Sequence, residues 1–316
     1  MTRTTSKRKE VMKTEPTKTD ARETDAPISR RDRFLTRLWL VLMLLPLVAG
    51  MLLELFLNPP SEGITVTGAQ VYFTVSLPFP NLPAPIRDLP ITESQVNSAL
   101  VLCFLFFFCL FLTQGMRTRG KSARQVLAEF IVEKVEGFVS GTMGAGYDGF
   151  PPFVCAILML SAFSSLLSLL GLYAPTSDIN VVGGWAILVF IMITRYKLKA
   201  GFGSYVKGFL EPIPVLAPFN VLSEFSTPIS MAFRHYGNVM SGGVIATLVY
   251  AGLAALSTAV FGWLPGFLGD IPFFQIGIPA VLSVYFDLFS GCLQAFIFAM
   301  LTMLYISLAA PEKESA

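Results

Sequence analysis

Apolar residues form a series of runs along this chain, separated by short polar or basic segments. A helix of about 20 predominantly apolar residues crosses a bilayer, because its backbone polar groups are bonded within the segment. The pattern therefore predicts an all-α integral membrane protein with about six membrane helices. The runs lie at residues 38–57, 99–112, 153–173, 185–194, 229–256 and 280–309.

The last two runs are longer than a bilayer requires. As unbroken helices, residues 229–256 and 280–309 would measure about 42 and 45 Å, against a hydrocarbon core of about 30 Å. Helices of this length must tilt strongly, kink or protrude from the membrane. Few charged residues follow Lys207, so we expect both helices to be strongly tilted within the membrane.

Two segments between the runs have other patterns. Residues 122–142 combine apolar positions at helical spacing with charged positions, which predicts an amphipathic helix on the cytoplasmic membrane surface. Residues 64–75 alternate with a period of two, which favours a short hairpin or an ordered loop.

Composition and charge placement agree with a membrane protein. Of 316 residues, 53% are hydrophobic and 14% are charged, which leaves too little polar surface for a soluble protein of this mass. Ten of the 23 Lys and Arg residues lie in residues 1–33, which we interpret as a disordered, basic cytoplasmic tail. The tail lacks interleaved aromatic residues, so a topology signal is favoured over a nucleic-acid site.

A retained N-terminal span fits residues 34–97 better than a cleaved signal peptide does. The basic region before the apolar run is unusually long, and residues 56–60 lack a small-residue cleavage pattern. We therefore predict an extra N-terminal span followed by an external loop. Basic residues follow the runs that end at Leu112 and Thr194, which places those ends and both chain termini in the cytoplasm.

Arg234 is the only Lys or Arg between Lys207 and Lys313. Insertion scales penalise an arginine at a bilayer centre by about 2.5–3.5 kcal/mol, so an arginine within an apolar run points to function. On a helix, Ser230 and Asn238 share its face at i−4 and i+4. These three residues are candidates for a functional site. The structural alternative is that Arg234 reaches a lipid headgroup by snorkelling.

Two acidic residues in apolar surroundings are further candidates. Asp287 would share one face of a regular α-helix with Gln294. The other polar or small residues on that face are Ser283, Ser290 and Gly291. A buried carboxyl group exchanges protons near neutral pH, so this stripe predicts an aqueous access path, with helix packing as the alternative. Glu224 lies before Arg234 and either lines an exit path or is a solvated acid at a helix end.

Two motifs resemble subunit a of the F-type ATP synthase. Residues 226–238 read Ser-Thr-Pro-Ile-Ser-Met-Ala-Phe-Arg-His-Tyr-Gly-Asn, and residues 293–302 read Leu-Gln-Ala-Phe-Ile-Phe-Ala-Met-Leu-Thr. Phe-Pro-Pro-Phe at 150–153 and Pro-Thr-Ser-Asp-Ile-Asn at 175–180 are also similar to that family. We therefore predict a subunit a-like membrane domain at residues 98–316.

The resemblance implies a stator subunit of the cell membrane, with two half-channels that lead protons to and from a rotating ring and couple their flow to ATP synthesis. Its implied partners are the proteolipid c-ring, the peripheral-stalk b subunits and membrane lipid, without nucleic acid. Gly243 resembles the first-helix partner of a titratable pair, with Asp287 as the second. His235 stands where leucine is more usual, and either completes the path or has a structural role. The implied ion-translocation residues are Arg234, Asn238, Asp287, Gln294, Ser230 and Glu224.

Other functional classes fit the chain less well. An ion or solute transporter or channel with an intramembrane Arg-Asp site is the alternative, but no repeated half with matching broken helices is present in the sequence. The sequence has no phosphate-binding G-x-x-x-x-G-K-[ST] loop, so we expect a non-catalytic subunit without cofactor or metal. Sodium is the alternative to the proton as the transported ion.

Overall fold

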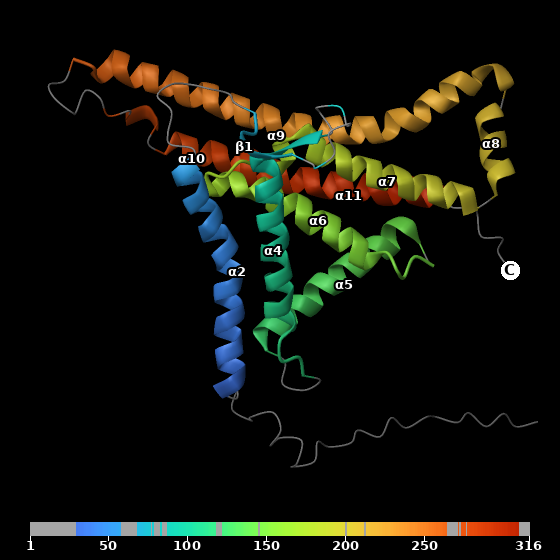
Figure 1. The fold of residues 1–316 in the computed structure, drawn as a ribbon, viewed down its shortest axis with the longest axis horizontal. Helices are drawn as coiled ribbons and strands as arrows, with labels where there is room; N and C mark the ends of the chain where they lie inside the picture. Colours follow the sequence, from blue (N-terminus) through green and yellow to red (C-terminus); the bar gives the residue numbers. More distant parts are fainter. Residues whose placement is uncertain are drawn as a thin grey trace, which may run out of the picture.

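The computed structural model describes residues 30–57, 68–76, 78, 83, 87–117, 122–144, 146–199, 201–211, 213–263, 271, 273–275 and 277–309. Helices make up most of this part of the chain (Figure 1). The elements are α2 (Arg30–Leu57), β1 (Val71–Ser76), β2 (Asp88–Thr92), α4 (Glu93–Thr113), α5 (Ala123–Met143), α6 (Pro151–Leu166), η1 (Leu167–Leu170), η2 (Pro175–Ser177), α7 (Ile179–Lys199), α8 (Phe202–Leu210), η3 (Pro214–Leu216), α9 (Ala217–Phe261), η5 (Phe273–Gln275), α10 (Ile278–Ser283), η6 (Val284–Ser290) and α11 (Gly291–Ala309).

Six of the described helical segments are long and apolar enough to cross a membrane, which confirms the predicted number. Residues 1–29 of the predicted disordered tail lie outside the described residues, and residues 30–33 already belong to α2. The six segments are Arg31–Phe56, Glu93–Thr113, Pro151–Leu170, Ile179–Lys199, Pro214–Phe261 and Val281–Ala309.

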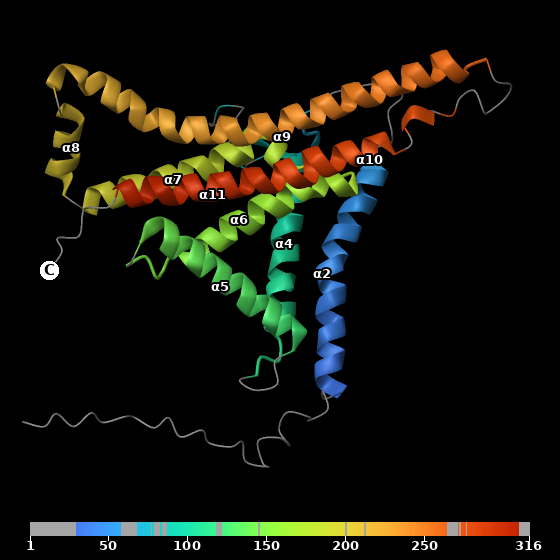
Figure 2. The same ribbon diagram turned by 180° about the vertical axis from the view of Figure 1, so that it is seen from behind.

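The N-terminal helix α2 packs along α4, and the two lie side by side in both views (Figures 1 and 2). Trp39 of α2 and Phe107 of α4 are in contact, with ring centroids 6.2 Å apart. A Cβ atom at Gly50 would lie 2.7 Å from Leu100 Cδ1, so the glycine allows close approach of the helices.

Helix α4 begins with polar residues, before the start that the apolar run predicts. The helix starts at Glu93, and the Thr92 side chain and Gln95 form a capping box there. Asn97 Nδ2 donates to the Tyr173 carbonyl at 2.9 Å, and Ser94 Oγ bonds Asp178. These partners satisfy the polar first turn, so the helix extends beyond its apolar residues.

The segment before α4 is a two-stranded antiparallel hairpin, as the period-two pattern suggested. Its register pairs Val71 with Thr92 at one end and Ser76 with Asp88 at the other. Ser76 Oγ also donates to Asp88 Oδ1 at 2.8 Å. Residues 64–67 of the predicted alternating segment lie outside the described residues.

The amphipathic helix predicted at 122–142 is α5, which begins after the N-cap Ser122. Its first half exposes apolar side chains such as Leu127 and Phe130, whereas Val139 and Met143 near its end are buried. The Phe138 ring stacks on Phe296 of α11 with centroids 5.0 Å apart. The second half of α5 therefore packs into the core, and the position of its first half at the membrane surface stays a prediction.

The main core lies between α6, α7 and α11. Its fully buried side chains include Val154 of α6, Val189 of α7, and Phe298 and Met303 of α11. In both views α9 runs across these helices, while α2 and α4 stand at a steep angle to α9 and α11 (Figures 1 and 2). All 45 residues of α9 are described, and few of them are buried, namely Pro228, Met231, Ala232, His235, Gly242 and Ser257.

The last long helical segment has the predicted extent but is not one regular helix. A π-helical stretch, η6, separates α10 from α11. Both of its ends are held by neighbouring elements: Tyr250 Oη lies 3.1 Å from Ser283 Oγ, and Ser165 packs on Gly291. A π-helical turn changes which residues share a face, and such turns are frequent at functional sites. The tilt of α9 and α11 in the bilayer stays a prediction.

Candidate functional site

Arg234 lies on the exposed side of α9. Ser230 and Asn238 are exposed on the same side, so the three predicted residues share a face of the helix. Within the described part of the chain, the guanidinium has no hydrogen-bond or ion-pair partner. A charged group in a largely apolar helix is costly in lipid unless another group compensates it.

Asn238 connects α9 to α11 one turn after the arginine. Its Nδ2 atom donates to Gln294 Oε1 at 2.8 Å, and the Gln294 side chain is buried. The two predicted motifs therefore meet in space at this bond, which holds the exposed face of α9 at a fixed position relative to α11.

His235 follows Arg234 by about 100° around the helix and is fully buried. Its Nε2 lies 3.3 Å from Ser161 Oγ of α6, and its ring contacts Trp185 and Phe298 edge to face. These contacts attach α9 to α6, α7 and α11. The structural role that the sequence left open for His235 is the one these contacts support.

Asp287 lines a cavity of about 230 Å³ between the second half of α9, the loop after α6, and η6. Gly243 of α9 lines the same cavity, so the two positions expected to form a pair do lie together. Because position 243 is glycine, Asp287 supplies the carboxyl group among the described residues that line this cavity. The remaining polar lining residues are Ser165, Ser168, Tyr173, Ser177 and Thr247.

The polar stripe expected on a regular helix is divided in the structure. Asp287 and Gly291 line the cavity, whereas Gln294 bonds Asn238 and Ser283 contacts Tyr250. The π-helical turn explains the difference, because the residues of η6 do not follow α-helical spacing. A continuous stripe from Asp287 to Gln294 was therefore a wrong prediction, although each residue lies in a polar environment.

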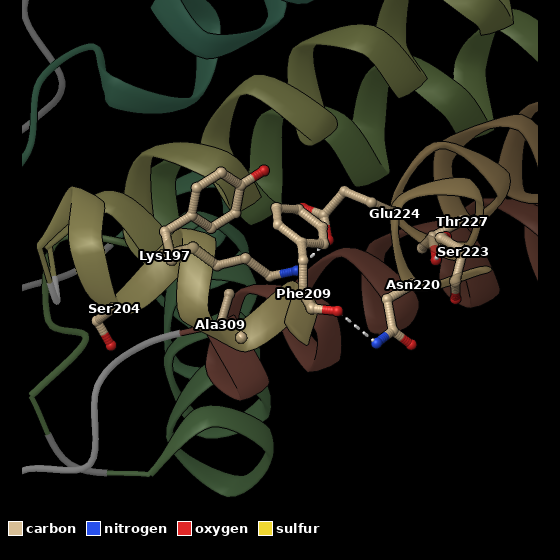
Figure 3. A pocket seen from close by; sticks show the side chains of 10 residues that line it. Lys197, Ser204, Phe209, Asn220, Ser223, Glu224, Thr227 and Ala309 are labelled. Carbon is tan, nitrogen blue, oxygen red and sulfur yellow. Dashed lines mark hydrogen bonds and ion pairs between the residues drawn. The ribbon is translucent and has the colours of Figure 1, made fainter. Parts of the chain in front are cut away.

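Glu224 lines a second cavity, of about 440 Å³, near the first turns of α9 (Figure 3). Its side chain is only 9% exposed and forms an ion pair with Lys197 of α7. Glu224 is therefore not a solvated acid at a helix end. Asn220 Nδ2 donates to the Phe209 carbonyl at 2.9 Å, which holds α8 as one wall of the cavity.

Three titratable residues that line these two cavities were not among the predicted site residues. Lys197 had been interpreted only as part of a basic topology signal, and no pattern distinguished Tyr205 or Tyr173. Burial, with a smaller contribution from Glu224, raises the pKa of Tyr205. Burial also raises the pKa of Tyr173 to about 12, with Asp178 adding to the effect.

Comparison with known proteins identifies the family. Residues 96–307 match the model of the ATP synthase A chain family. ATP synthase subunit a of Desulforamulus reducens is 32% identical over 216 residues, which are 67% of this chain and 75% of that protein. The Priestia megaterium subunit a is 30% identical over 236 residues, 70% of this chain and 94% of that protein.

A sodium ion specific subunit a, from Propionigenium modestum, is 26% identical over 276 residues, or 79% of this chain and 86% of that protein. Helix α2 precedes the region that matches the family model. The matched region contains Arg234, both carboxyl groups and the Asn238–Gln294 bond. The chain therefore belongs to the family of subunit a of the F-type ATP synthase, the non-catalytic, multi-pass stator subunit that translocates ions in the cell membrane.

Proposed function

We propose that this chain leads protons to and from a rotating proteolipid ring through two half-channels, and that Arg234 separates them. The proposal rests on the order of the cavity-lining residues and Arg234 along α9. Residues of α9 between 220 and 228 line cavities that contain Glu224, and residues between 239 and 247 line the cavity that contains Asp287. Arg234 lies between the two groups of residues.

Arg234 would compensate a ring carboxylate as that group passes the stator. A carboxylate in lipid-like surroundings is costly, and a fixed guanidinium lowers that cost. Arginine stays protonated under all relevant conditions, so it cannot relay a proton between the half-channels. The Asn238–Gln294 bond would keep the exposed arginine face at a fixed distance from α11.

Asp287 would serve the outer half-channel and Glu224 the cytoplasmic one. A carboxyl group can accept and release a proton, whereas the hydroxyl groups around Asp287 orient water. The two cavities would give the ring access to opposite sides of the membrane. Ser230, next to Arg234 on the exposed face, would line the contact with the ring.

The proposed partners follow from the same arrangement. The exposed face of α9 would contact the c-ring, and the peripheral-stalk b subunits would hold the chain against rotation. The proton is the proposed ion, because Asp287 can transfer a proton through water without a fixed set of cation ligands.

Two measurements on the complete complex test the proposal. In a background without the four native cysteines, Thr227→Cys should react with a membrane-impermeant thiol reagent from the cytoplasmic side, and Thr247→Cys from the outer side. Reaction of both from one side would contradict two half-channels. Vesicles containing the complex should acidify with ATP equally well in sodium-free buffer; a sodium requirement would overturn the choice of ion.

A further inference from the structure

The ion pair between Lys197 and Glu224 lies at the junction of two cavities. The larger cavity, of about 440 Å³, is lined on its other sides mainly by α8 and by polar residues of α9. The smaller cavity, of about 200 Å³, lies between the apolar sides of α7, α9 and α11. Lys197, Glu224 and Thr227 line both cavities.

The two cavities differ in polarity. The larger contains Ser204, Tyr205, Asn220 and Ser223, and Figure 3 shows Lys197 reaching from α7 toward Glu224 beside Asn220 and Ser223. The smaller is lined elsewhere by Phe190, Ile193, Pro228, Tyr305 and Leu308. Thr227 lines both cavities, and Pro228, the next residue along α9 toward Arg234, lines only the smaller one.

One oxygen of Glu224 accepts no hydrogen bond among the described residues. Lys197 Nζ pairs with Oε2, whereas Oε1 is buried and has no donor at hydrogen-bond distance and geometry. The Tyr205 hydroxyl group of α8 also interacts with this carboxyl group. Water typically satisfies a buried acceptor of this kind, and water or a hydrated proton has the right chemistry for Oε1. The charged or titratable groups that line the larger cavity are Lys197 of α7, Tyr205 of α8 and Glu224 of α9.

We propose that Lys197 is the gate of the cytoplasmic half-channel. The inference rests on the proposed role of Glu224 in that half-channel. The ammonium group holds the carboxylate across the boundary between the cavities. A proton arriving from the smaller cavity binds Glu224 Oε1, Lys197 releases Oε2, and the proton leaves to water in the larger cavity. Lys197 keeps its own protons throughout, so the ion pair re-forms without net change.

The ion pair is not the principal contact that holds α7 against α9. Val182 and Ala186 of α7 pack with Ala232 of α9 in a separate buried cluster, and the Phe190 and Phe225 rings lie 5.4 Å apart. Changes at Lys197 should therefore alter proton passage more than assembly. Lys199, two residues along the same helix, carries the same charge and stacks on Tyr196 instead.

Passive proton flow through vesicles stripped of the soluble sector tests the gate, with a potassium diffusion potential as the driving force. Lys197→Arg should slow the flow about three- to tenfold, because a guanidinium binds both carboxylate oxygens. Lys197→Gln should accelerate it by a similar factor, because the amide holds the carboxylate only weakly. Lys199→Gln is the matched control and should conduct at the parental rate. All rates are normalised to the amount of assembled complex.

The outcomes separate the gate from the exit path itself. If Glu224→Gln conducts at the parental rate, the proposed exit path is wrong and the gate falls with it. If Glu224→Gln conducts protons slowly, the exit path is supported. The gate is then wrong if both Lys197 variants conduct at the parental rate, or if both change the rate in the same direction. If Lys197→Gln does not assemble, the Lys197→Arg variant alone tests the gate. Proton flow at the parental rate in Lys197→Arg would overturn the gate. Slower flow in Lys197→Arg, together with slower flow in Glu224→Gln, would support it.

Discussion

The Glu224 cavity and the Asp287 cavity differ in how each carboxyl group is compensated. Glu224 is nearly buried and forms an ion pair with a lysine from another helix. No Lys or Arg is among the described residues that line the Asp287 cavity. Asp287 instead shares its cavity with glycine and with hydroxyl groups, namely Ser165, Ser168, Tyr173, Ser177 and Thr247.

The tasks proposed for the two acids therefore follow from their surroundings and not from their residue type. A carboxylate beside a fixed cation is favoured in its charged form and can accept hydrogen bonds from passing water. A carboxyl group among hydroxyl groups can take up and release a proton without breaking an ion pair. The two half-channels would therefore respond differently to the same substitution.

Removing Arg234 should remove the positive charge that is proposed to separate the two half-channels. We expect Arg234→Ala to lower ATP-driven pumping by at least about 100-fold, because a buried carboxylate that loses its cationic partner is destabilised by about 3–5 kcal/mol. The variant should still insert, since the guanidinium has no hydrogen-bond or ion-pair partner among the described residues. Pumping by reconstituted complexes measures the effect, with Thr258→Ala on the exposed far end of α9 as the control. A variant that pumps at half the parental rate would contradict the role of Arg234.

Asp287→Asn should test the role of the carboxyl group in the outer cavity, because it removes the proton-binding group and leaves the size of the side chain unchanged. The amide keeps the shape of the side chain but cannot transfer a proton, so we expect pumping to slow at least about tenfold while assembly is retained. Asp287→Glu should keep partial function. Asp148→Asn, at an exposed aspartate outside this cavity, is the matched control. Parental pumping by the Asn variant across the pH range would show that the path avoids Asp287.

Much of the fold could be predicted because membrane helices need continuous apolar residues. The six spans, α5 and the strand hairpin follow from local periodicity. The early start of α4 could not be predicted, because Ser94 and Asn97 enter the helix with partners supplied by Asp178 and Tyr173, far along the chain. The π-helical turn at η6 likewise has no recognised local signal, and its ends are held by other elements.

Site residues that lie on one face of a single helix could be predicted from the sequence. Arg234, Asn238 and Ser230 share such a face, whereas the bond between Asn238 and Gln294 was not predicted, because it joins two helices. Lys197 was missed because its partner Glu224 lies 27 residues away, so only tertiary packing reveals the pair. The roles of all these residues in translocation stay predictions.

Gly291→Ala should test the close packing beside the Asp287 cavity. A Cβ atom there would lie 2.8 Å from Ser165 Cβ, so overpacking should destabilise the subunit by about 1–3 kcal/mol. Thermal unfolding of the assembled complex measures the change. Gly252→Ala is the matched control, because no atom lies within 4 Å of its added Cβ and the alanine should stabilise α9. Adding Ser165→Gly should restore stability; if Gly291→Ala alone is neutral, the packing is looser than the structure indicates.

Tyr173→Phe should have the smallest effect and identifies which group of the outer cavity titrates. The pKa of Tyr173 is raised to about 12 by burial first and by Asp178 second, so the phenol stays protonated between pH 6 and pH 9. It cannot relay protons by ionising in this range, and its hydroxyl group donates to the Ser177 carbonyl at 3.0 Å. The variant should lose about 0.5–1.5 kcal/mol of stability with that bond and keep the parental pH dependence of pumping. A shifted pH profile would transfer the titrating role from Asp287 to Tyr173.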